Sequence, residues 1–220
     1  MINILLNIYK VDDEWCFHEF KNYIKAEHKV TVIPFAFNEE RIHSNESWLA
    51  YYGENEGIYF PGIVNSFHSY GIKYENINWI NYFADSKEIA KNKIANSDIL
   101  FFLGGLPDKI MLRLEEFDLI KTIEQHKGII IGYSAGAMIQ IENYHITPDN
   151  DYSTFGYYKG MKMINESDIE VHFEHTDLQL ESIERVKKET GKPVYAIEDY
   201  GAIIVEQNRV KMVGKVHYFG

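Results

Sequence analysis

The chain has 220 residues with a formal net charge of −11, and 45% of the residues are apolar, as in globular rather than disordered proteins. No basic stretch is present, so a nucleic-acid-binding surface is not expected. The one cysteine, Cys16, leaves no partner for an internal disulfide and no cysteine cluster for a metal.

The sequence also carries no sign of a membrane segment. No apolar run reaches membrane-spanning length, and the first residues lack the basic start of a signal peptide. We therefore expect a protein of the cytoplasm without membrane contact. No linker, repeat or low-complexity tract divides the sequence, so residues 1–220 are expected to form one domain.

Apolar strands and amphipathic helices alternate through the first two thirds of the sequence, which predicts a parallel sheet covered by helices on both faces. Strands are predicted over Ile2 to Tyr9, Lys29 to Phe37, Ile77 to Phe83 and Ile99 to Leu103. Helices are predicted over Glu14 to Glu27, Ile58 to Tyr70 and Asp85 to Ala95, and then as one long helix whose apolar face carries Ile110 through Ile123. The polar stretch Asn38 to Glu56 is interpreted as a surface loop, with a lid as the alternative.

The most informative stretch is a Gly-x-Ser-x-Gly pattern at residues 132–136. It follows a short apolar strand, Ile129 to Ile131, and precedes small and apolar residues that suit a helix. This order is the one that a nucleophile elbow needs, because the tight turn projects the hydroxyl of Ser134 from the end of a sheet. The N–H of Ala135 at the helix start would then point to the place where an oxyanion forms.

The last third of the sequence reads as a loop, a helix and several short strands. The predicted elements are a loop over Asn143 to Gly160, a strand over Ile169 to Phe173, a helix from Thr176-Asp177 to Thr190, and strands over Val194 to Ile197, Ala202 to Val205 and Val210 to Val216. The last two strands are expected to form a hairpin around Gln207-Asn208.

A serine nucleophile needs a base, a group that orients the base, and oxyanion donors. Because ligands of such sheets bind beyond the carboxyl ends of the strands, these groups are sought just after apolar runs. Gly104-Gly105 follows one strand and either offers an N–H to the oxyanion or only serves the turn. His172, which ends a predicted strand, is the best-placed base among nine histidines. Glu198-Asp199 follows another strand and either supplies the orienting carboxylate or forms a solvated turn.

His172, Glu174, His175 and Asp177 can also be interpreted as a metal cluster. Their spacing matches no ligand signature, so no metal and no cofactor are expected.

Four motifs together resemble a known family. Gly104-Gly105, the elbow from Gly132 to Ala137, Val171-His172-Phe173 and the stretch Ile197 to Ile203 are similar to the ordered motifs of the dipeptidase E and cyanophycinase family of serine peptidases. That family has a fold like that of the class I glutamine amidotransferases, a three-layer α/β sandwich with a mostly parallel central sheet, and carries serine where those enzymes have cysteine.

The resemblance implies a role for each matching residue. Ser134 would be the nucleophile, His172 the general base, and Asp199 or Glu198 its carboxylate partner, with Asp199 favoured. Gly105 and Ala135 would supply the oxyanion N–H groups.

The sequence departs from the family pattern in two places: Leu106 stands where members often have a third glycine, and Glu174, His175 and Asp177 follow Phe173 where many members have a basic residue. No arginine lies near the motifs in the sequence, so a strong preference for N-terminal aspartate is not expected.

The function predicted from these observations is hydrolysis of a dipeptide or short peptide, with a homodimer left open. One alternative is an esterase-type α/β-hydrolase in which Ser134, Asp199 and His217 act in that chain order. The other is a non-catalytic amidotransferase-like domain that binds a ligand or partner.

Overall fold

The computed structural model describes residues 1–54 and 56–220. The strands are β1 (Ile2–Leu6), β2 (Val30–Ile33), β3 (Ile77–Trp79), β4 (Ile99–Phe102), β5 (Ile129–Tyr133), β6 (Asn143–Ile146), β7 (Gly156–Lys159), β8 (Asp168–Glu170), β9 (Val194–Glu206) and β10 (Arg209–Phe219). The α-helices are α1 (Glu14–Phe20), α2 (Asn45–Tyr52), α3 (Phe60–His68), α4 (Lys87–Ala95), α5 (Pro107–Glu116), α6 (Ile120–Glu124), α7 (Ala135–Met138) and α8 (Asp177–Thr190). None of the helices within the described ranges is long and apolar enough to cross a membrane.

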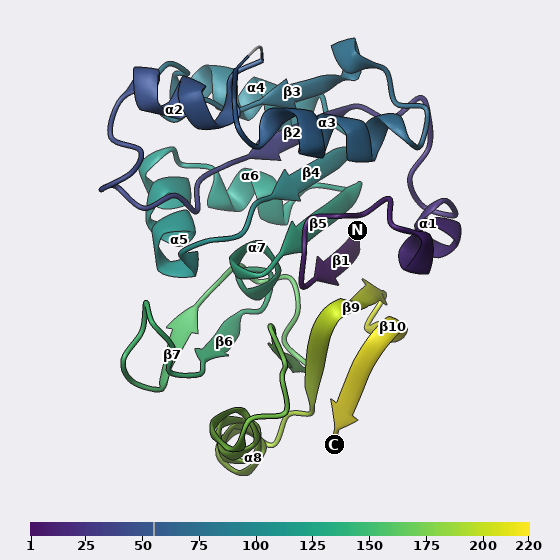
Figure 1. Cartoon of the computed structure of the whole chain (residues 1–220), viewed down its shortest axis with the longest axis vertical. Coiled ribbons are helices and arrows are strands. Elements are labelled where there is room, and N and C mark those ends of the chain that lie inside the picture. Colours follow the sequence, from purple (N-terminus) through teal and green to yellow (C-terminus); the bar gives the residue numbers. More distant parts are fainter. Residues whose placement is uncertain (55) are drawn as a thin grey trace.

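One large sheet organises the molecule (Figure 1). Its strand order is β10-β9-β1-β5-β4-β2-β3, and β8 pairs with the first part of β9. Strands β1, β5, β4, β2 and β3 run parallel, whereas β9 is antiparallel to β1 and β10 is antiparallel to β9. The carboxyl ends of the parallel strands therefore meet at one edge, where the predicted nucleophile lies.

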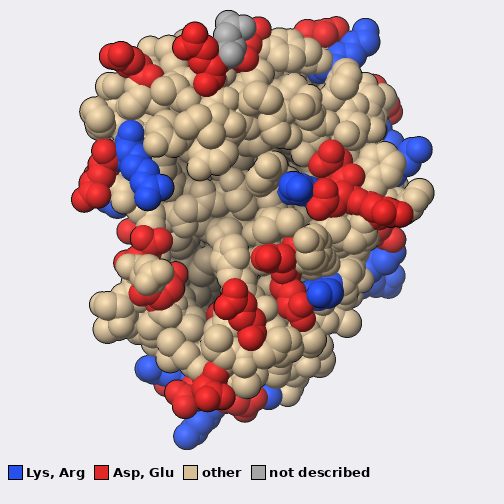
Figure 2. Space-filling model, in the orientation of Figure 1, with Lys and Arg blue, Asp and Glu red and all other residues tan. Residues whose placement is uncertain are grey.

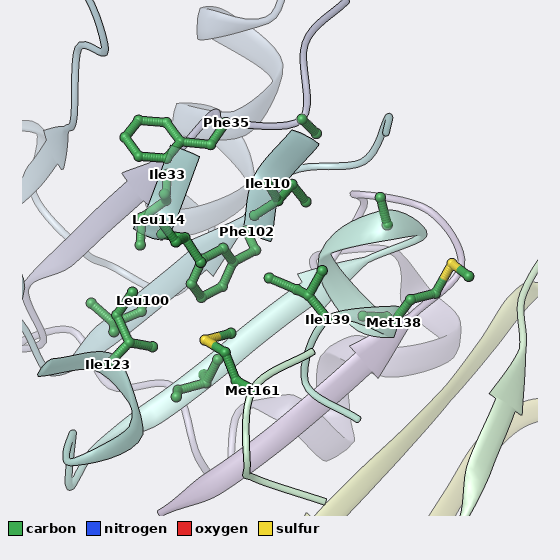
Figure 3. Packing of buried hydrophobic residues seen from close by; sticks show 14 of the residues in the cluster. Ile33, Phe35, Leu100, Phe102, Ile110, Leu114, Ile123, Met138, Ile139 and Met161 are labelled. Atoms are coloured by element: carbon green, nitrogen blue, oxygen red, sulfur yellow. The ribbon is translucent and has the colours of Figure 1, made fainter. Parts of the chain in front are cut away.

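Two apolar cores lie on opposite faces of this sheet, because successive strand residues point to opposite sides. In β4, Leu100 and Phe102 enter one core, and Phe101 enters the other. Helices α4 to α7 cover the first core, which also holds Ile110 and Ile139 (Figure 3). Helices α1, α2 and α3 cover the second. The predicted three-layer α/β fold with a mostly parallel sheet is confirmed.

The long helix predicted through Ile110 and Ile123 is in fact two helices, α5 and α6. Asp118 has a φ of 54°, in the left-handed region where an α-helix cannot continue. The chain turns there, and the N–H of Leu119 donates to the carbonyl of Leu114 at 2.9 Å. The apolar periodicity continues on both sides of the break, so it carries no signal for the turn.

Two predictions for the last third were wrong in detail. The predicted loop over residues 143–160 contains the hairpin of β6 and β7, in which Tyr144 stacks on Tyr158. The two short strands predicted between Val194 and Val205 are one continuous strand, β9. The predicted hairpin turn is confirmed, since both Gln207 and Asn208 have positive φ, as tight two-residue turns require.

The stretch Asn38 to Glu56 is not a plain surface loop, because it contains α2. Ser44 and Ser47 form a reciprocal capping box at the start of this helix. Trp48 and Tyr52 are buried in the core beneath it. Residue 55 of the stretch lies outside the described residues. The helix brings part of this stretch to the cavity described below.

Candidate active site

Ser134 occupies a strained turn between β5 and α7, as the elbow pattern predicted. Its φ of 50° and ψ of −120° lie in a region that L-residues rarely adopt. The N–H of Ser134 is held by the carbonyl of Leu6 at 2.9 Å. The pattern's glycines make this possible, since a Cβ on Gly132 would lie 2.0 Å from the carbonyl oxygen of Gly136, and one on Gly136 would lie 2.5 Å from that of Phe102.

His172 lies against Ser134, with its Nε2 2.9 Å from the serine Oγ. The predicted strand around it is shorter than expected: β8 ends at Glu170, and His172 follows in the left-handed region with a φ of 53°. Side chains on both sides hold this turn. The backbone N–H of His172 donates to Asn7 Oδ1 at 2.6 Å, and Gln179 Nε2 donates to the carbonyl of His172 at 2.8 Å. The structure thus brings together the predicted nucleophile and the predicted base.

The two candidate carboxylates, Glu198 and Asp199, face different surroundings. Asp199 Oδ1 accepts a 2.7 Å hydrogen bond from Asn7 Nδ2, and so is linked through Asn7 to the backbone of His172. Glu198 accepts hydrogen bonds from His217 and His175, which hold the pKa of its carboxyl below the usual range. Among the hydrogen bonds of residues 1–54 and 56–220, none joins either carboxylate to the imidazole of His172.

Gly105 and Ala135 carry the two backbone N–H groups that the sequence predicted as oxyanion donors. Gly105 has a φ of 138°, and a Cβ there would lie 2.3 Å from the carbonyl oxygen of Ala36. Ala135 is the first residue of α7, so its N–H has no partner within the helix. Neither N–H donates to an acceptor in the part of the chain that the structure describes. The two groups can therefore serve as oxyanion donors.

A buried arginine fixes the loop that supports Gly105. Arg113 on α5 is 1% exposed, and its Nη1 donates to the carbonyls of Phe35 at 2.6 Å and Phe37 at 2.8 Å. Its guanidinium also lies 3.6 Å from the centre of the Phe37 ring. The loop's Ala36 carbonyl in turn accepts the N–H of Leu106, the residue after Gly105. Burial lowers the pKa of Arg113, whereas the charge of Glu39 opposes this shift.

Two cavities meet at Ser134, and both are lined by Gly105, Asp151 and His172 as well. The first, here called the cationic cavity, has a volume of about 550 Å³ and is lined by Lys10, Arg41 and several tyrosines, which are Tyr9, Tyr51, Tyr52, Tyr59 and Tyr133. The second, here called the acidic cavity, has a volume of about 610 Å³ and is lined by the carboxylates of Asp149, Asp151, Glu170 and Glu174. Figure 2 shows one face of the molecule hollowed near its centre, with more acidic than basic side chains around the hollow.

A strong preference for N-terminal aspartate was not expected from the sequence, because no arginine lies near the motifs along the chain. The structure contradicts this premise, since an arginine lines the cationic cavity. Arg41 is far from the motifs along the chain, but it lines the same cavity as Ser134. Asn7 and Asp151 were also missed. Asn7 could have been found, since it follows the apolar run of β1 at the carboxyl edge of the sheet. Asp151 lies in a stretch with no periodic pattern, so the sequence offered no signal for it.

A second histidine near the site has a different environment. His145 on β6 is 1% exposed, and its two ring nitrogens contact Asp168 at 2.8 Å and Glu170 at 2.7 Å. Thr147 Oγ1 donates to the same oxygen of Glu170 at 2.7 Å. Burial lowers the pKa of His145, but the charges and hydrogen bonds of the two carboxylates outweigh it and raise the pKa to about 10. The surroundings of His145 therefore favour its charged form.

The alternative interpretation of His172, Glu174, His175 and Asp177 as a metal cluster, which the sequence did not favour, finds no support in the fold. Of the metal-ligating residues in the described ranges, His175 instead meets Glu198 and His217, and these three side chains offer ligand atoms within 4.8 Å of one another.

Comparison with known proteins gives the family and the fold of the chain. The family model described as peptidase family S51 matches residues 11–213 of the chain. The fold is similar to that of a protein described as a candidate peptidase E from Listeria monocytogenes EGD-e, with a TM-score of 0.69 and 19% identity over 97% of this chain and 98% of that one. It is also similar to a peptidase from an acI-B1 Actinobacterium, with a TM-score of 0.64 and 17% identity over 99% of this chain and 90% of that one. A search of curated proteins found no match.

Proposed function

This chain belongs to peptidase family S51 and is a serine-type peptidase, and we propose that it hydrolyses dipeptides or short peptides through an acyl-enzyme on Ser134. The observation that carries the proposal is the 2.9 Å contact between Ser134 Oγ and His172 Nε2 at the point where the two cavities meet.

In the first half of the reaction, His172 Nε2 takes the proton of Ser134 Oγ as the oxygen attacks the scissile carbonyl carbon. His172 then gives this proton to the leaving amine nitrogen, and the C–N bond breaks. In the second half, His172 removes a proton from water, the hydroxide oxygen attacks the ester carbonyl, and the proton returns to Ser134 as the acid leaves.

The negative charge that develops on the carbonyl oxygen would be stabilised by the backbone N–H groups of Gly105 and Ala135. Backbone donors suit this role because the sheet edge and the loop under Gly105 already hold them, so little reorganisation accompanies the reaction. The Arg113 contacts support this view, since they fix the loop carbonyls next to Gly105.

For the third member of the triad we propose Asp199 rather than Glu198. Asp199 reaches the turn of His172 through Asn7, whereas Glu198 is occupied by His175 and His217. The hydrogen bonds also favour His172 over His217 as the base, because the imidazole of His217 bonds to Glu198 and not to Ser134. This argues against the esterase-type order.

The charges of the two cavities support a small zwitterionic substrate. A dipeptide carries an ammonium group at one end, a carboxylate at the other, and the scissile bond between them. Glu170 is paired with His145, so Asp149, Asp151 and Glu174 of the acidic cavity are the carboxylates that suit the ammonium group. Arg41 with Lys10 in the cationic cavity suits a carboxylate, which is either the C-terminus or an acidic side chain. We therefore expect both free termini to contribute to binding.

Steady-state kinetics on a small set of dipeptides tests this substrate class. We expect N-acetylation or C-terminal amidation of a good dipeptide to lower kcat/KM at least about tenfold each, since each removes one charge contact. Aspartyl and alanyl dipeptides should be compared in wild type and in Arg41→Gln. A carboxylate-binding role predicts that Arg41→Gln raises KM with little change in kcat. Longer peptides that are cleaved faster than every dipeptide would contradict the proposed substrate class.

A further inference from the structure

The surface beside the active site carries a side-chain cluster that catalysis does not use. His175 lies in the turn before α8, Glu198 at the end of the first part of β9, and His217 near the end of β10. His217 Nε2 is 2.7 Å from Glu198 Oε1, and His175 Nε2 is 3.2 Å from the same oxygen. We propose that His175, Glu198 and His217 form a binding site for Zn²⁺.

The donor set suits zinc. Two imidazoles and one carboxylate, with a water in the remaining position, form a recurring protein zinc site. Imidazole nitrogen also favours the later first-row metals over Mg²⁺ and Ca²⁺, which take oxygen ligands. The three residues come from separate parts of the chain, so no spacing motif in the sequence announced them.

The distances suit zinc as well. A tetrahedral zinc ion with ligand bonds of about 2.0–2.1 Å holds its ligand atoms about 3.3 Å apart. The separation between His175 and Glu198 already matches that value, and the 2.7 Å separation between His217 and Glu198 needs to open by only about 0.6 Å. The side chains of His175 and His217 are 53% and 40% exposed, so an ion can reach them from solvent without unfolding the site.

The backbone and an aromatic ring hold the ligands in place. The ring of Phe173 lies 4.3 Å from that of His175 and 5.5 Å from that of His217, centre to centre. A bulge between Gly214 and Val216 breaks the regular pairing of β10 with β9 next to Glu198. His175 itself has a φ of 60°, a costly conformation that points to a turn fixed by its surroundings.

One neighbouring charge opposes the metal. Lys215 Nζ lies 3.5 Å from Glu198 Oε2, the carboxylate oxygen that the histidines do not contact. The lysine side chain is 62% exposed and can turn away, but its charge should weaken the binding of a cation. Replacing Lys215 should therefore strengthen zinc binding, whereas replacing one of the three ligands should weaken it.

Titration of the metal-free full chain with Zn²⁺ by calorimetry tests the site, with Co²⁺ absorption as a second readout of coordination geometry. We expect one Zn²⁺ per chain, and a tetrahedral Co²⁺ spectrum that Zn²⁺ displaces. His175→Asn, Glu198→Gln and His217→Asn should each weaken binding about 100-fold or more, since even the loss of a residue behind a metal ligand costs 10–100-fold. His18 is an exposed histidine on α1, so His18→Asn should leave binding unchanged, and Lys215→Met should tighten it several-fold.

Several results would overturn the proposal. These are the absence of saturable binding by wild type, a stoichiometry other than one, or affinity that survives in any of the three ligand variants. Circular dichroism of each variant separates loss of a ligand from loss of fold, and Lys215→Met keeps the test decisive if a ligand variant does not fold. Because the readout is metal binding, the outcome is independent of whether Ser134 is the nucleophile.

Discussion

Two histidine sites lie next to strand β8. In both, polar side chains contact the imidazole ring, but the His172 contact is exposed and the His145 contacts are buried. His172, two residues beyond the strand, contacts Ser134 and faces two cavities. His145, packed against the strand, is enclosed by the carboxylates of Asp168 and Glu170. The second site has the stronger ionic contacts, yet its histidine is buried and both of its ring nitrogens are occupied.

The difference shows which features indicate catalysis and which indicate stability. Ser134 and His172 both adopt positive φ, so the fold holds this pair in a strained arrangement and leaves it open to a ligand. Removing one partner of a buried ion pair is costly, because it leaves an uncompensated charge in the interior. We therefore expect changes at Ser134 and His172 to affect rate alone, and changes at His145 to affect stability.

The largest effect is expected at the reactive pair. Ser134→Ala and His172→Ala should each lower kcat by about 10⁴-fold or more with unchanged circular dichroism and unchanged thermal midpoint. The double variant should be little worse than either single one, because nucleophile and base act as a unit. His217→Ala is the matched control and should stay within a few-fold of wild type. An active His172→Ala together with an inactive His217→Ala would reverse the assignment of the base.

The next largest effect is on stability, at His145. His145→Gln leaves the carboxylates of Asp168 and Glu170 buried without a cation, which should lower the free energy of unfolding by about 3–5 kcal/mol. Urea unfolding measures this loss. At a temperature where the variant remains folded, its kcat should lie within a few-fold of wild type. A variant as stable as wild type but inactive would mean that the two sites have been assigned the wrong way round.

The buried group of His145, Asp168 and Glu170 should also make the free energy of unfolding depend on pH. Because the pKa of His145 is about 10 in the folded protein against 6.5 for the free side chain, folding takes up a proton between these values. The stabilisation that the protonated His145 contributes is complete below pH 6.5 and is lost as the pH rises through about 10. Thermal midpoints of wild type should therefore fall over this range more steeply than those of His145→Gln. Parallel curves for the two proteins would exclude a charged His145.

A smaller effect on rate is expected from Asn7, which joins Asp199 to the turn of His172. Asn7→Ala removes both hydrogen bonds, and a loss of about 1–3 kcal/mol at the base corresponds to about a tenfold to 100-fold drop in kcat. Asp199→Asn should follow in the same direction, and Glu198→Gln should be milder than either. If Glu198→Gln is the most damaging of the three, the orienting carboxylate is Glu198.

The sequence predicted the parts of this molecule that depend on local patterns. The apolar runs indicated the sheet, and the glycines around Ser134 indicated the elbow, because a strained turn restricts which residues it accepts. Patterns of this kind cannot say which distant residues meet. Arg41 lines the cationic cavity although it is far from Ser134 along the chain, His175 in its turn meets His217 on β10, and the break at Asp118 depends on a single backbone conformation.

Reaction with an active-site-directed organophosphonate tests the central claim most directly, because it reports the nucleophile without knowledge of the substrate. We expect one adduct per chain by intact mass, located on Ser134 by peptide mapping. The adduct should be absent in Ser134→Ala, strongly slowed in His172→Ala, and formed at near wild-type rate in folded His145→Gln. An adduct on any other residue, or labelling of Ser134 that does not depend on His172, would contradict the account.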